Sequence, residues 1–172
     1  MSTELDTERI WVVDRDNRPL AVMSAEQAHL QGLRHRGFLL LVSDPRGRLI
    51  LRRLDKEHPL HPGRWDIAGS GHVRAGEVAE EAALRHLPPG TADPQTLRYT
   101  LTLEKDAGTG DEIVDVFVAS VSDQAAQFLA RNPEFLVVDL DELAALAVSF
   151  PDQLTPALMT AWAARLYAVT AS

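Results

Sequence analysis

Cysteine is absent from the 172-residue chain, and this excludes disulfides, thiolate zinc sites and a cysteine nucleophile. Long apolar runs are absent as well, because no stretch approaches the roughly 20 residues that a membrane-spanning helix needs. The opening stretch MSTELDTERI is polar and acidic, whereas a secretory signal is first basic and then apolar. Together these absences predict a cytoplasmic protein without a membrane partner.

Positive charge is scarce, since 17 Lys and Arg residues stand against 25 Asp and Glu residues and leave a formal net charge of -8. This balance argues against a broad nucleic-acid surface, so no nucleic-acid partner is expected. It is compatible with a small anion in a local basic pocket. The 45% apolar composition and the lack of a low-complexity tract predict a single domain over residues 1–172. The sequence leaves the oligomeric state open.

Short strands and helices alternate along the chain. Residues 10–13 and 20–23 are apolar around a turn-prone segment and predict a hairpin. A second hairpin is predicted for residues 38–42 and 48–54, joined by the tight turn DPRG. The remaining strands are expected at 97–104, 112–121 and 135–138, around a flexible KDAGTGD tip, with helices at 25–31, 77–87, 123–131 and from Pro156 onwards. This order predicts an α/β fold with a mixed sheet.

The segment EVAEEAALRHL, residues 77–87, has helical periodicity. Val78 and Ala82 are expected to face the core. Glu77, Glu81 and Arg85 recur every four residues and are expected on another face. The PPG that follows should end the helix, because proline inside a helix costs about 3 kcal/mol.

The segment around this helix resembles the signature of the Nudix hydrolases, G-x5-E-x7-R-E-U-x-E-E-x-G-U, in which U is a large aliphatic residue. Gly71, Glu77, Arg85 and Leu87 match that signature in register. The stretches EQAHLQGLRHRGF, GRLILRR, HPGRWDIAGSGHV and DLDELAAL are similar to the branch of isopentenyl diphosphate isomerase. The likeness spans roughly residues 10–166 and implies a Nudix fold, an α/β/α sandwich around a mixed β-sheet.

The resemblance implies a divalent cation, Mg²⁺ or Mn²⁺. Nudix hydrolases hold it with glutamates that follow the signature arginine, because a hard cation prefers oxygen ligands. In this chain His86, Pro89 and Gly90 stand at those places, so the signature helix is expected to bind the ion weakly.

Three glutamates are the remaining catalytic candidates. Glu77 and Glu81 lie on the signature helix, and Glu112 lies in a late region that often completes metal binding or acts as a base in the family. A structural role is the alternative for the first two, which are spaced to pair with Arg85 and tether a loop. For Glu112 the alternative is an acid in a solvated loop.

The isomerase branch implies a second metal site, because its members bind a divalent metal through histidines and late glutamates. The matching residues here are His29, His35, His72 and Glu112. The catalytic cysteine of the isomerase falls at Ser70, and one late glutamate falls at Gly110. Serine cannot replace a thiolate in that proton chemistry, so isomerisation of isopentenyl diphosphate is not expected.

Basic residues gather around the end of one predicted strand and the loop that follows it. Arg52, Arg53 and Arg64 are predicted to bind a diphosphate, since guanidinium groups suit bidentate phosphate contacts. In the alternative, they point to solvent while Trp65 packs as a core residue.

The predicted function is therefore binding of a small-molecule diphosphate, with weak or displaced activity as a hydrolase of nucleoside diphosphate derivatives. One alternative is a non-catalytic ligand sensor or protein-interaction module. Another is an isomerase-like divalent-metal site without isomerase activity. The missing signature carboxylates favour a non-catalytic protein, whereas the arginine-rich loop predicts ligand binding in each case.

Overall fold

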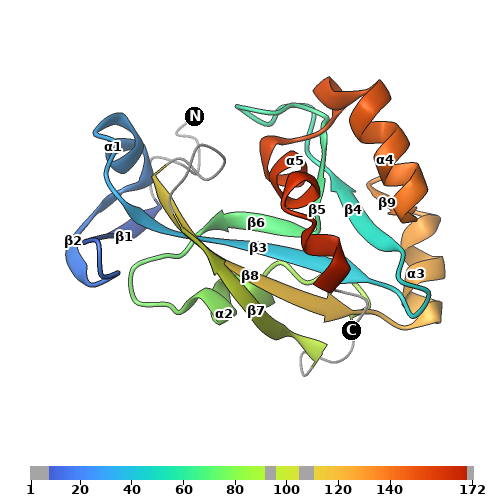
Figure 1. Ribbon diagram of the computed structural model, residues 1–172, viewed down its shortest axis with the longest axis horizontal. Coiled ribbons are helices and arrows are strands. Elements are labelled where there is room, and N and C mark those ends of the chain that lie inside the picture. The colour runs from blue at the N-terminus through green and yellow to red at the C-terminus, as the bar shows by residue number, and fades with distance from the viewer. Residues whose placement is uncertain (1–7, 92–95, 105–110, 170–172) are drawn as a thin grey trace.

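The computed structural model describes residues 8–91, 96–104 and 111–169, whose strands join in one mixed sheet (Figure 1). The strands are β1 (Arg9–Val13), β2 (Pro19–Ser24), β3 (His35–Ser43), β4 (Leu49–Arg53), β5 (Trp65–Ile67), β6 (Gly69–His72), β7 (Arg98–Leu103), β8 (Glu112–Ser120) and β9 (Phe135–Val138). The helices are α1 (Ala25–Leu30), α2 (Ala79–Leu84), α3 (Asp123–Ala130), α4 (Leu140–Ser149) and α5 (Pro156–Ala163), with 3-10 turns at Pro151–Gln153 and Leu166–Val169. Gly110 and all but the last residue of the predicted KDAGTGD tip lie outside the described residues.

Strand β3 is the centre of the sheet. It pairs in parallel with β8, from His35 opposite Glu112 to the end of the strand, and antiparallel with β6, where Gly37 lies opposite His72. The start of β3, the start of β8 and the end of β6 therefore meet at one place. The β1–β2 hairpin and α1 lie at this end of the molecule, away from α3, α4 and α5 (Figure 1).

Side chains of β3 alternate between the two faces of the sheet, as the period of a strand requires. Phe38, Leu40 and Val42 pack in one core with residues of α2 and α3, whereas Leu39 and Leu41 pack in another with residues of α4 and α5. Helices thus cover both faces, and the expected α/β/α sandwich around a mixed sheet is confirmed.

Polar caps set where the helices begin. The Ser24 hydroxyl accepts from the backbone N–H of Gln27 at the start of α1. Thr155 caps α5 in the same way, and Pro156 occupies the first helical turn, where its missing N–H costs nothing. None of the described helices has the length and apolar character to cross a membrane.

The predicted hairpin of β3 and β4 is confirmed and turns at DPRG, although the two strands pair only at Ser43 and Leu49, because β4 continues between β5 and β9. One local expectation was wrong. The predicted helix over residues 77–87 is α2 alone: Val78 is its N-cap and is 60% exposed rather than in the core. From His86 onwards the backbone hydrogen bonds span three residues, because the prolines that follow cannot continue a helix.

Candidate functional site

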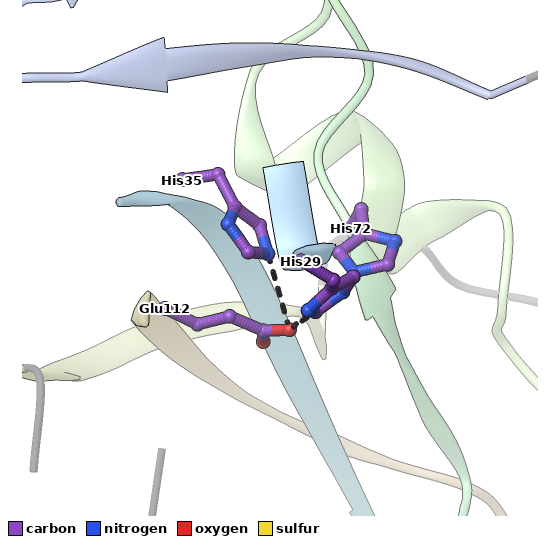
Figure 2. A group of neighbouring side chains, drawn as sticks. All are labelled: His29, His35, His72 and Glu112. Atoms are coloured by element: carbon purple, nitrogen blue, oxygen red, sulfur yellow. Dashed lines mark hydrogen bonds and ion pairs between the residues drawn. The ribbon is translucent and has the colours of Figure 1, made fainter. Parts of the chain in front are cut away.

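Three histidines and one glutamate meet at the end of β3 that adjoins α1. His29 comes from α1, His35 begins β3, His72 ends β6 and Glu112 begins β8. Each residue offers one ligand-type atom, and these atoms lie within 4.8 Å of one another. Figure 2 shows the four side chains pointing toward one another. The structure therefore brings together all four residues named by the isomerase resemblance, which we call the histidine–glutamate cluster.

His35 is the most deeply buried member of the cluster, with no exposed surface. Its Nδ1–H donates to the carbonyl oxygen of Leu33 at 2.7 Å, so the ring is fixed with Nε2 directed to the cluster. That Nε2 atom is buried, makes no hydrogen bond with the described residues and lies 3.4 Å from Oε1 of Glu112. Because buried polar atoms usually have a partner, this atom indicates a place for a ligand.

Charges within the cluster are strongly coupled. Burial alone would lower the pKa of His72, but the carboxylates of Glu112 and Glu8 outweigh it and raise that pKa to about 9. Burial would likewise raise the pKa of Glu112, but His35 and His72 lower it to about 2. Burial, helped by the neighbouring histidines, lowers the pKa of His29. At neutral pH the Nε2–H of His72 thus donates to Nε2 of neutral His29, 2.9 Å away, beside an ionised Glu112.

Two supporting residues escaped the sequence analysis. Gly37 leaves room for the carboxylate, since a Cβ built there would lie 2.6 Å from Oε2 of Glu112. Glu8 accepts a hydrogen bond from Nδ1 of His72 at 3.0 Å. No periodicity or motif spacing in the sequence indicates these roles. Glu8 lies in the polar, acidic opening stretch MSTELDTERI.

The signature glutamates are held by protein partners. Both carboxylate oxygens of Glu77 accept from the guanidinium of Arg85, at 2.7 and 3.2 Å, and one also accepts from the backbone N–H of Arg74. The carboxylate of Glu81 accepts from the backbone N–H of Val78 at the start of α2. Glu77 and Glu81 lie outside the histidine–glutamate cluster.

A cleft of about 1150 Å³ adjoins the cluster. Its wall includes His29, His72 and Glu112 together with several arginines. The arginines are Arg9, Arg52, Arg53, Arg74 and Arg85. A site for a divalent cation and a lining suited to an anion therefore share one cavity.

The three predicted anion-binding arginines differ in their contacts. Arg52 lines the cleft, and its buried Nε makes no hydrogen bond. Arg53 also lines the cleft, but its Nε–H donates to the carbonyl of Gly63 and its guanidinium lies over the ring of Trp65. Arg64 is not part of the cleft wall and donates to the carbonyl of Leu154 at 3.4 Å.

Asp66 lines the same cleft and contacts Arg52. It is buried and accepts from the hydroxyls of Thr155 at 2.6 Å and Ser70 at 3.1 Å. Its Oδ2 lies 3.7 Å from an Arg52 guanidinium nitrogen. Ser70, which stands at the isomerase cysteine, therefore has its hydrogen committed to a carboxylate.

Comparison with curated proteins finds similarity to isomerases and hydrolases of one superfamily. The isopentenyl-diphosphate Delta-isomerase of Burkholderia multivorans is 40% identical over 82 residues, which are 46% of this chain and 46% of the relative. An uncharacterized Nudix hydrolase of Pseudomonas aeruginosa is 35% identical over 82 residues, 48% of each chain. The match thus spans about half the length of these relatives, and no protein-family model matches the chain.

Solved structures agree with the fold. The Deinococcus radiodurans protein DR0079 superposes with a TM-score of 0.62 at 18% identity, covering 83% of this chain and 90% of its own. A MutT/Nudix family protein of Listeria innocua gives a TM-score of 0.50 at 18% identity. The superposition covers 78% of this chain and 94% of the Listeria protein. These likenesses concern the fold alone.

Proposed function

From its likeness to isopentenyl-diphosphate isomerases and Nudix hydrolases, we propose that the chain is a Nudix-superfamily protein that binds a divalent cation and a small organic diphosphate side by side. The cation is assigned to the histidine–glutamate cluster and the diphosphate to the adjoining cleft. Any chemistry is thereby assigned to the histidine–glutamate cluster and not to the signature helix.

The observation that carries the proposal is Nε2 of His35, a buried nitrogen that has no hydrogen bond and lies among three further ligand-type atoms. Three imidazoles and one carboxylate suit a first-row transition ion better than Mg²⁺, which prefers oxygen ligands. Of the two ions expected from the sequence, Mn²⁺ is therefore the better fit, and Zn²⁺ suits the same donors. When bound, such an ion supplies positive charge next to the phosphate oxygens.

The diphosphate is assigned by charge. Arg52 presents a buried guanidinium nitrogen without a hydrogen bond, and Arg53 lies beside it on the same strand. Guanidinium groups in a partly closed cleft form charge-assisted hydrogen bonds with phosphate. We leave Arg64 out of the site, because its guanidinium is turned to Leu154.

Glu112 is the proposed catalytic carboxylate, since it is ionised and lines the cleft. Glu77 and Glu81 are proposed to support the loop before α2 instead, because hydrogen bonds from the protein already engage their carboxylates. Ser70 offers no thiol, so the proposed chemistry excludes isomerisation of isopentenyl diphosphate.

Calorimetry tests both halves of the proposal. Metal-free protein is titrated with Mn²⁺ and Zn²⁺, and then with isopentenyl diphosphate, ADP-ribose and inorganic pyrophosphate, with and without the metal. We expect one metal site per chain that is lost in His35→Asn, and diphosphate binding that is tighter with metal and weaker at high salt. Failure of both metals to bind at millimolar concentration would overturn the metal site. Failure of every diphosphate to bind or to raise the melting temperature would overturn the anion site.

A further inference from the structure

The carboxylate of Glu8, which precedes β1, contacts the nitrogen of His72 that faces away from the cluster. Oε2 of Glu8 lies 3.0 Å from Nδ1 of His72, while Nε2 of the same ring lies 2.9 Å from His29 and 3.4 Å from Glu112. The two nitrogens of His72 thus have different partners. One faces a carboxylate outside the cluster, and the other faces the cluster itself.

Glu8 is itself held in place. Its Oε1 lies 3.5 Å from Nε of Arg74, and its backbone carbonyl accepts from the N–H of Ala25 at 3.0 Å. Ala25 is the first residue of α1, the helix that carries His29. The carboxylate is only 20% exposed, so water competes weakly for its oxygens. Glu8 therefore joins the strand of one histidine to the helix of another.

An ionised carboxylate accepts hydrogen bonds and donates none, so the nitrogen that faces Glu8 must carry the hydrogen. We infer that Glu8 is a positioning residue of the cluster: it holds the hydrogen of His72 on Nδ1 and leaves Nε2 as the atom that a metal ion can take. His35 is fixed in the same way by the Leu33 carbonyl. Partners of this kind fix the tautomer of a ligating histidine and raise its basicity.

The inference rests on the proposed function for its effect on metal affinity, but its geometry has a test of its own. In metal-free protein at pH 10, above the His72 pKa of about 9, nitrogen-15 NMR reports which ring nitrogen keeps its hydrogen. We expect Nδ1–H in the wild type and a larger share of Nε2–H in Glu8→Ala. An Nε2–H tautomer in the wild type would overturn the inference, whether or not any metal binds.

Metal affinity gives the second test. Zn²⁺ binding should weaken by about 10- to 100-fold in Glu8→Gln, the range for partners of metal-bound histidines. Glu26→Gln removes an exposed carboxylate from the first turn of α1 and serves as the matched control, with unchanged affinity.

A double-mutant cycle separates positioning from general stability. In a His72→Ala background, Glu8→Gln should have no further effect on affinity, because the ring on which it acts is gone. Equal losses in both backgrounds would show that Glu8 does not act through His72. If Zn²⁺ fails to bind while the wild-type tautomer is Nδ1–H, the proposed metal site fails and the positioning of the ring stands.

Discussion

The signature helix and the histidine–glutamate cluster border the same cleft but differ in how their polar atoms are satisfied. The carboxylate of Glu77 has two contacts from Arg85 and one from a backbone N–H. In the cluster, by contrast, Nε2 of His35 is buried without a hydrogen bond. The helix therefore has the contacts of a structural support, whereas the cluster has the contacts of a site that receives a ligand.

This contrast shows why a sequence signature and a functional site need not coincide. Glu77 and Arg85 match the signature in register, and they hold the loop before α2 in shape. The signature residues that shape the backbone are therefore present. The positions at which the signature has metal-binding carboxylates are occupied by His86, Pro89 and Gly90. The site of chemistry is therefore indicated by buried polar atoms that lack hydrogen bonds, and not by the motif that matches best.

The largest expected effect compares one carboxylate from each region. Glu112→Gln should weaken Mn²⁺ or Zn²⁺ binding by at least about 100-fold, because even indirect partners of metal ligands change affinity by about 10- to 100-fold. Glu77→Gln should leave the affinity within about twofold and lower the melting temperature, since it loses an ion pair and not a ligand. Calorimetry and thermal unfolding of both variants measure the two effects. A stronger loss of affinity in Glu77→Gln would reverse the comparison.

The next effect concerns the arginines that were predicted to bind the diphosphate. Arg52→Ala should weaken diphosphate binding by about 1.5–3 kcal/mol, or roughly 10- to 100-fold, since a charge-assisted contact is lost. Arg64→Ala removes the same charge outside the cleft wall and should change binding little. Titration at low and high salt checks this, and equal losses in both variants would indicate only a general effect of net charge.

The alternation of strand and helix patterns predicted the mixed sheet, because these periods are local features. The resemblance to the Nudix and isomerase families, and not periodicity, implied its two covered faces and named the four cluster residues. The sequence did not predict that β3 and β4 separate after one pair, since pairing depends on which other strands compete for β4. Nor did it single out Gly37 or Glu8. Their roles arise from contacts with Glu112 and His72 that only the folded chain creates.

The stability of the metal-free protein should depend on pH through the cluster. The His72 pKa is raised from 6.5 to about 9, so its contribution is complete below pH 6.5 and is lost as the pH rises through 9. The Glu112 pKa is lowered from 4.5 to about 2, so its contribution is complete above pH 4.5 and is lost as the pH falls towards 2. These two groups favour the highest melting temperature between pH 4.5 and 6.5, whereas the lowered pKa of His29 opposes them as the pH falls below 6.5, because its protonated form is less favourable in the folded chain.

The matched variants separate the cluster from the helix in this pH profile. Glu112→Gln should flatten the fall in melting temperature between pH 6.5 and 9, because His72 then keeps only Glu8 as an acidic partner. Glu77→Gln should lower the whole curve and keep its slope, since Glu77 pairs with an arginine that stays charged over this range. Parallel curves for the wild type and Glu112→Gln would contradict the coupling of the cluster.

The smallest expected effect lies at Ser70, on the cluster side of the cleft. A proton shuttle at an allylic carbon needs an acid and a base near neutral pKa, and a serine hydroxyl bound to Asp66 supplies neither. Wild-type protein with Mn²⁺ should therefore not convert isopentenyl to dimethylallyl diphosphate in a coupled assay.

Ser70→Cys introduces a thiol with an ordinary pKa near 8.5 and leaves all four cluster residues in place, so a trace of conversion is expected. The double variant Ser70→Cys with Glu112→Gln should abolish that trace, because it removes the proposed base. Turnover by the wild-type chain would contradict the assignment, since the cluster would then perform isomerase chemistry without the thiol.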